Sequence, residues 1–166
     1  VMNIGELLVN VITVLLFYFF ISRTFTLRRL HWICRGIGLM LLFVLITLLN
    51  LMNIAPTITC VSGLICQILY TMVFAEGSRG ARLLIGGIPA LLAVVSDSVT
   101  FSVLGILFQD TSEALTVNSA IRSQALVIYI LTYCLLIWAV IQFFPQDLKF
   151  PGYFEGVIFL TCGLGV

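Results

Sequence analysis

Residues 83–107 read LLIGGIPALLAVVSDSVTFSVLGIL and carry a single charge, Asp97. A helix of this length extends about 37 Å, and the hydrocarbon core of a bilayer is about 30 Å thick. The stretch is therefore predicted to cross a membrane with some tilt. A carboxylate at the centre of a span costs about 2.5–3.5 kcal/mol on insertion scales. We therefore expect Asp97 to face other helices or a wet cavity.

Small residues mark the packing surface of this predicted span. They lie on one stripe at four-residue spacing, interrupted only by the larger Val94, and on a second stripe that also carries Asp97: Gly86, Ala90, Ser98 and Ser102, then Ala93 and Gly105. Small side chains let helices approach closely in lipid, so we expect this span to be the central packing helix of a bundle. Pro89, near its start, is expected to kink it.

The composition indicates a polytopic membrane protein. Of the 166 residues, 61% are hydrophobic and only 9% are charged, whereas a soluble domain averages about 25% charged residues. The net charge of +1, without a basic patch, gives no reason to expect a nucleic-acid partner. No basic region precedes the first apolar run, so we expect a retained span and not a signal peptide.

The predicted fold is an all-α transmembrane helix bundle with five full spans and an incomplete sixth. The spans are placed at residues 4–22, 36–53, 57–75, 83–107, 123–144 and, incomplete, 153–166. The last run would reach about 21 Å as a helix, too short to cross. We therefore expect the chain to be a single domain that is part of a longer protein. The longest and most polar connection is predicted at residues 108–122.

Positive charge predicts the orientation. The loops after spans one, three and five, with their flanks, hold seven basic residues: Arg23, Arg28, Arg29, Arg35, Arg79, Arg82 and Lys149. The opposite side holds only Arg122. Because cytoplasmic loops of membrane proteins are enriched in Lys and Arg, the amino terminus is predicted to lie outside the cell membrane.

Polar side chains from four spans then fall in the outer half of the bilayer. They predict a ligand-binding pocket open to the outside, lined by Glu6, Asn10, Gln67, Asp97, Tyr129 and Tyr133. The alternative is that each group forms a hydrogen bond with another helix for packing, at about 0.6–2 kcal/mol each. For Glu6, a further alternative is an exposed position at the membrane interface.

Catalytic, metal and cofactor sites are not expected. The five cysteines lie in or beside apolar runs without a CxxC motif and are interpreted as reduced thiols. The lone imidazole, His31, offers no metal-ligand spacing. Paired with Cys34 it would suit a membrane peptidase. An interfacial aromatic cluster with Trp32 is the simpler interpretation of the same residues.

The layout resembles the membrane sensor region of GHKL-type histidine kinases of the accessory-gene-regulator quorum-sensing kind. Four segments carry the resemblance: FYFFISRTF at 17–25, EGSRGARLLIGG at 76–87, VVSDSVTFSVLGILF at 94–108 and LKFPGYF at 148–154. The nearly absent loop after span two also matches.

The resemblance implies a sensor half that binds an extracellular ligand, often a peptide, and biases a homodimeric kinase. In that family an odd number of spans is followed by a helical dimerisation segment and an ATP-binding domain, and neither is present here. His31 does not correspond to the family's phospho-accepting histidine. A different function also fits the predicted pocket, namely a small membrane transport component with an outward-facing substrate site.

Overall fold

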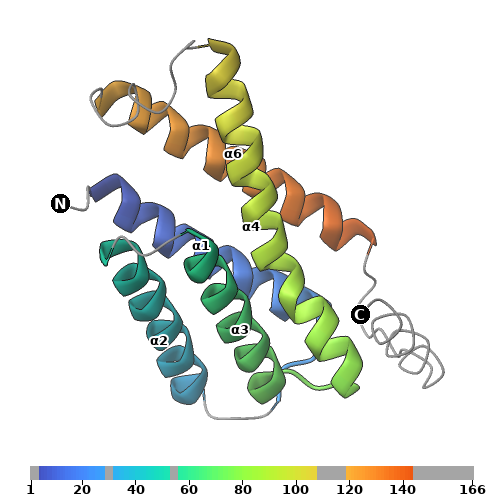
Figure 1. Ribbon diagram of the computed structural model, residues 1–166. Coiled ribbons are helices and arrows are strands. Elements are labelled where there is room, and N and C mark those ends of the chain that lie inside the picture. Colours follow the sequence, from blue (N-terminus) through green and yellow to red (C-terminus); the bar gives the residue numbers. More distant parts are fainter. Residues whose placement is uncertain (1–3, 29–31, 53–55, 108–118, 144–166) are drawn as a thin grey trace, which may run out of the picture.

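The fold is a bundle of α-helices, seen in a computed structural model that describes residues 4–28, 32–52, 56–107 and 119–143 (Figure 1). The helices are α1 (Ile4–Thr24), α2 (Trp32–Leu51), α3 (Pro56–Phe74), α4 (Arg79–Leu107) and α6 (Ser119–Phe143). The predicted all-α class is confirmed for the described residues.

Four of these helices have the length and apolar composition of membrane spans: α1, α2, α4 and α6. The apolar part of α3, Ile58–Phe74, is shorter than the other four. These helices support the membrane assignment. The predicted sixth span at 153–166 lies outside the described residues.

Three helices begin four residues earlier than predicted. α2 begins at Trp32, α4 at Arg79 and α6 at Ser119, where spans were expected from 36, 83 and 123. A charged residue lowers the local hydropathy and therefore limits the predicted span, but it need not limit the helix. A helix can continue from the hydrocarbon into the headgroup region.

The start of α4 illustrates this correction. Ser78 caps the helix: its hydroxyl oxygen accepts a hydrogen bond from the Ala81 amide at 3.2 Å, and its carbonyl accepts one from the Arg82 amide at 3.1 Å. A serine side chain that satisfies an open helical amide is a common helix start. Much of the expected loop at 76–82 is therefore the first turn of α4.

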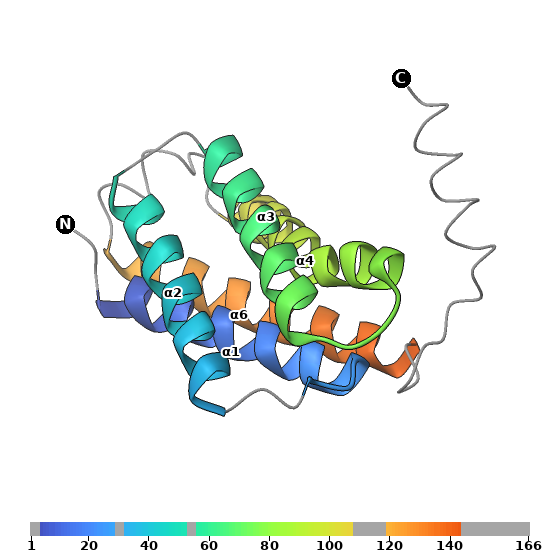
Figure 2. The ribbon, with the colours of Figure 1, turned by 90° about the horizontal axis from the view of Figure 1, so that it is seen from below.

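The five helices form a closed ring in the order α1, α2, α3, α4, α6 and back to α1. Successive helices run in opposite directions (Figures 1 and 2). A ring with an odd number of members cannot alternate throughout, so α1 and α6, which close it, run parallel. The amino-terminal ends of α1 and α6 therefore lie at the same end of the bundle as the carboxyl ends of α2 and α4.

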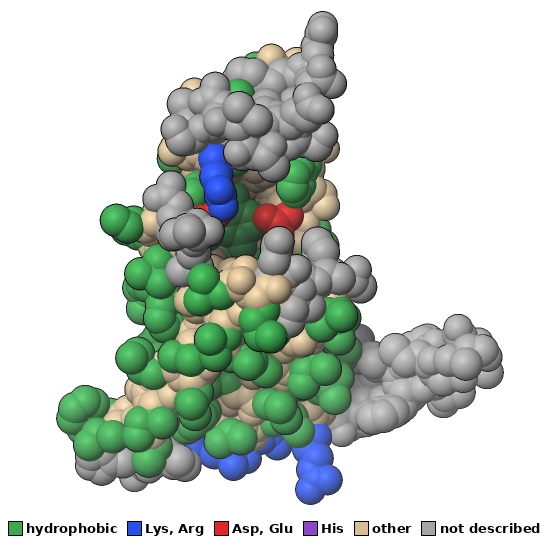
Figure 3. Space-filling view, turned by 60° about the vertical axis from the view of Figure 1, so that its left-hand side comes forward, with side chains coloured by type: hydrophobic (Ala, Val, Ile, Leu, Met, Phe, Trp, Pro, Cys, Tyr) green, Lys and Arg blue, Asp and Glu red, His purple; other side chains and the backbone are tan. Residues whose placement is uncertain are grey.

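The opposite end gathers the basic side chains, some of which project from the bottom of the molecule in Figure 3. Here the segments after α1 and α3 pair as an isolated β-bridge between Leu27 and Ala75. The Arg28 amide donates to the Phe74 carbonyl at 2.9 Å, and the Glu76 amide donates to the Thr26 carbonyl at 2.8 Å. We call this end of the bundle the basic end and the other end the cavity end.

An aromatic core fills the half of the bundle nearer the basic end. The rings of Phe17 and Tyr70 form a T-shaped pair with centroids 5.4 Å apart, and the centroids of Tyr70 and Phe74 lie 4.6 Å apart. Fully buried side chains from α1 and α6, including Phe20 and Ile137, extend the same cluster. These large side chains fill the space between the helices in this half of the bundle.

Close packing of α3 on α4 depends on Gly86. A β-carbon added there would lie 2.8 Å from the Cβ and Oγ1 atoms of Thr71, closer than real side chains approach. The small-residue stripe therefore works as expected in the first half of α4, where Gly86 and Ala90 are buried. In the second half Ser98 and Ser102 are exposed, so this part of the stripe is not buried.

Candidate functional site

A cavity of about 340 Å³ lies between the helices in the half of the bundle opposite the basic end. All five described helices contribute to its wall. Its main polar side chains are Asn10, Thr13, Asn50, Gln67, Asp97 and Tyr129. Figure 3 shows a hollow at this end of the molecule, with acidic and basic side chains beside it. The remaining wall is largely apolar, as is usual for small-molecule pockets.

Asp97 projects from α4 into the wall of this cavity. Its side chain is exposed, and it forms no hydrogen bond or ion pair with another described residue. The neighbouring hydroxyls are engaged elsewhere, since Ser96 donates to the Leu92 carbonyl at 2.8 Å and Ser98 donates to the Val94 carbonyl at 3.0 Å. The carboxylate is therefore available to a ligand or to water.

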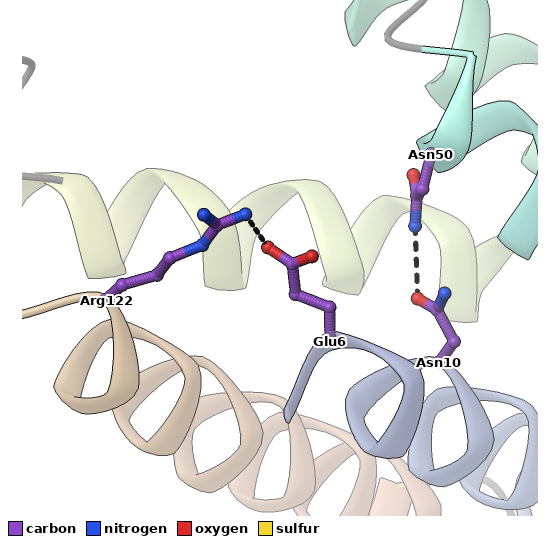
Figure 4. A network of polar contacts seen from close by, with 4 residues as sticks. All are labelled: Glu6, Asn10, Asn50 and Arg122. Carbon is purple, nitrogen blue, oxygen red and sulfur yellow. Dashed lines mark hydrogen bonds and ion pairs between the residues drawn. The ribbon is translucent and has the colours of Figure 1, made fainter. Parts of the chain in front are cut away.

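Asn10 joins α1 to α2 at the edge of the cavity (Figure 4). Its side-chain amide donates to the Thr47 hydroxyl at 3.4 Å, and its side-chain oxygen accepts a hydrogen bond from the Asn50 amide at 3.1 Å. Asn10 is buried, and these hydrogen bonds satisfy its side-chain amide, which could not form hydrogen bonds with lipid chains. Sequence reasoning missed Asn50 and Thr47, although their three-residue spacing in an otherwise apolar run places both on one helical face.

Gln67 enters the cavity from α3 and is only 3% exposed. Its side-chain oxygen has no hydrogen-bond partner among the described residues. An unpartnered buried acceptor costs about 1–3 kcal/mol, so such an atom is generally satisfied by water or by a ligand. Gln67 thus brings a buried acceptor without a protein partner to the same cavity wall as Asp97.

The two predicted tyrosines divide between wall and core. Tyr129 lines the cavity, whereas Tyr133, one turn further along α6, is fully buried in the core. Their rings stack with centroids 5.9 Å apart. Tyr133 lies outside the cavity wall because it is on the part of α6 that packs into the aromatic half of the bundle.

Glu6 lies one helical turn before Asn10 and forms an ion pair with Arg122 of α6 (Figure 4). The side chains are 24% exposed for Glu6 and 43% for Arg122. The parallel arrangement of α1 and α6 brings these two amino-terminal turns together. Glu6 therefore belongs to an ion pair beside the cavity and is not among the side chains of its wall. Sequence reasoning missed Arg122, although it is the one basic residue predicted for the outer side.

The described residues contain no group of three or more His, Cys, Asp or Glu side chains that could hold a metal ion. The described cysteines, Cys34, Cys60, Cys66 and Cys134, are unpaired thiols on separate stretches of α2, α3 and α6. His31, the proposed partner of Cys34, lies outside the described residues.

Four of the six predicted site residues, Asn10, Gln67, Asp97 and Tyr129, thus lie on one cavity wall. Comparison with family models, with curated proteins and with solved structures gives no match to this chain.

Proposed function

We propose that this chain is a membrane-embedded sensor domain that binds an extracellular ligand in the cavity between its five described helices. The observation that carries the proposal is the cavity itself, in which Asp97 and Gln67 offer polar atoms without a protein partner. A carboxylate and an amide on one largely apolar cavity wall give that space polar groups that can fix the orientation of a bound ligand.

The proposed orientation places the cavity end outside the cell. Arg23, Arg28, Arg35 and Arg79 belong to helix ends and connections at the basic end. Among the described residues, the cavity end has the single basic residue Arg122, which Glu6 pairs. The positive-inside rule then assigns the basic end to the cytoplasm and the amino terminus to the outside.

We propose five full spans, with α3 as one of them, and a sixth beginning near residue 153. α3 has to return the chain from the cavity end to the basic end, because α2 and α4 both run the other way. Its shorter apolar part, Ile58–Phe74, would cover about 25 Å. Local thinning of the bilayer can accommodate such a mismatch at a modest cost.

The aromatic core near the basic end favours a sensor over a transporter. A substrate crossing the protein would have to pass the aromatic core, in which Phe17 and Tyr133 have no exposed surface and Tyr70 is 6% exposed. A sensor needs only the cavity and a helix whose position depends on occupancy. The homodimeric histidine kinase implied by the resemblance would supply the output. A protein kinase domain in the reading frame after Val166 would support this part, and a stop codon just after the sixth span would favour transport.

Native cysteines provide a test of the proposed orientation and access. Cys60 lines the cavity on α3, and Cys34 is exposed near the start of α2 at the basic end. We expect a membrane-impermeant maleimide added to intact cells to label a variant that retains only Cys60. A variant that retains only Cys34 should react only after permeabilisation. The reverse pattern would overturn the orientation and with it the extracellular ligand.

A filled cavity supplies the matched control. Gly63 lines the cavity, and a β-carbon added there meets no atom within 4 Å. Gly63→Leu should therefore fold and slow the labelling of Cys60. Gly36→Leu, at an equally open glycine near the basic end, should leave the labelling rate unchanged. Equal rates in the two variants would contradict access through the cavity.

A further inference from the structure

We propose that the ligand of the cavity is a small organic cation, an ammonium group carried on an apolar or aromatic body, and that Asp97 binds the cationic group. The inference rests on the proposed function, because it names the class of ligand for the same cavity. It is carried by the charges, the wall chemistry and the volume of the described site.

The charges at the cavity end do not balance. Glu6 is neutralised by Arg122, whereas Asp97 has no basic partner among the described residues. A carboxylate without a basic partner raises the local concentration of cations and disfavours anions. A cationic ligand would also supply the counter-charge that a carboxylate at membrane depth lacks.

The wall chemistry suits an ammonium group on an apolar body. Phe101 and Tyr129 line the same cavity as Asp97, and aromatic faces attract ammonium groups. Apolar side chains such as Val94 and Leu104 cover much of the remaining wall. Gln67 adds an acceptor without a protein partner, which could take a hydrogen bond from a primary ammonium.

The volume limits the size of the ligand. Pockets for drug-sized molecules range over about 300–1,000 Å³, and this cavity, at about 340 Å³, lies at the lower end. It therefore fits a compact molecule with one charged group and one ring or short alkyl body. A larger ligand would have to leave most of its surface outside.

The test compares two probes of nearly equal shape, phenethylammonium and the neutral 2-phenylethanol. The purified chain is placed in nanodiscs of zwitterionic phosphatidylcholine, and binding is titrated by saturation-transfer NMR against empty nanodiscs. We expect the wild-type chain to bind phenethylammonium at least about tenfold more tightly than 2-phenylethanol, since hydrogen bonds to a charged group are the stronger kind. In Asp97→Asn the two affinities should agree within about twofold, with the fold retained because the site is exposed.

Two controls make the outcomes distinct. Glu76→Gln removes an exposed carboxylate at the basic end and should keep the preference for the cation. Gly63→Leu should weaken both probes. A preference for the cation that survives Asp97→Asn would overturn the role of Asp97. Equal binding of both probes to the wild type, lost in Gly63→Leu, would overturn the cationic ligand and leave the cavity as a binding site. Binding of neither probe would overturn both proposals.

Discussion

Replacement of Gly86 by alanine tests the packing that holds α4 on α3. The added methyl group would lie 2.8 Å from both Cβ and Oγ1 of Thr71. Because Cβ is fixed to the backbone, a change of rotamer cannot relieve this contact, and the helices must separate. Overpacking of this kind costs about 1–3 kcal/mol. The helix propensity of alanine offsets part of the cost, by about 1 kcal/mol relative to glycine.

Alanine substitutions at two other glycines separate the cost of the close contact at Gly86 from the gain in helix propensity. At Gly87 the nearest atom to an added β-carbon is the flexible end of Leu64, at 3.1 Å, and at Gly63 nothing lies within 4 Å. The free energy of unfolding should therefore fall in the order Gly63→Ala, Gly87→Ala, Gly86→Ala. The first and last variants should differ by about 1–3 kcal/mol, since the propensity gain is common to both.

Reversible unfolding in mixed micelles with rising sodium dodecyl sulfate, followed by circular dichroism, would measure these differences. Equal unfolding free energies for the Gly63 and Gly86 variants would refute the close approach of α3 and α4. An inverted order would mean that another surface of α4 carries the packing.

Three further predictions concern the polar contacts, and each can be measured by the same unfolding assay. A double-mutant cycle with Glu6→Gln and Arg122→Gln should give a coupling energy of about 0.2–1 kcal/mol that shrinks in high salt, because the pair is partly exposed to solvent. Asn10→Ala should destabilise the chain by about 1–2 kcal/mol, because it removes both hydrogen bonds to α2; a neutral effect would contradict the bridge. Arg82, 8% exposed, donates to the Met72 carbonyl at 2.6 Å. Arg82→Met should cost about 1.5–3 kcal/mol, and Arg82→Lys should recover part of the loss if the hydrogen bond is responsible.

The sequence predicts the helices well because hydropathy over 20 residues measures the property that lipid selects. It misses the helix starts at Trp32, Arg79 and Ser119 because charge marks the limit of the hydrocarbon and not the limit of the helix. The cap that starts α4 comes from Ser78, which lies within a polar stretch that hydropathy counts only as loop.

The site is partly predictable for a related reason. Depth along each span follows from residue number, so Asn10, Gln67, Asp97 and Tyr129 could be assigned to one level of the membrane. Which face of each helix turns inward depends on the order of helices around the ring, and a single sequence does not contain that order. Tyr133 shows the limit, since it lies one turn from Tyr129 and is packed in the core.

The seam between α1 and α6 is where occupancy of the cavity could be converted into movement. α6 supplies Ala125, Leu126 and Tyr129 to the cavity wall, and its other end leads toward the carboxyl-terminal part of the chain. At the seam, a β-carbon added at Gly5 would lie 3.1 Å from the flexible end of Leu126.

Leu126 can move aside for a β-carbon, but a leucine at position 5 adds three further carbons to this seam. Gly5→Leu should therefore push α6 outward and widen the cavity, so that Cys60 reacts faster with an impermeant maleimide than in the Gly36→Leu control. An unchanged rate would mean that α6 does not yield at this seam. The movement that a sensor requires would then have to arise in α4, the other helix that packs against α6 and lines the cavity.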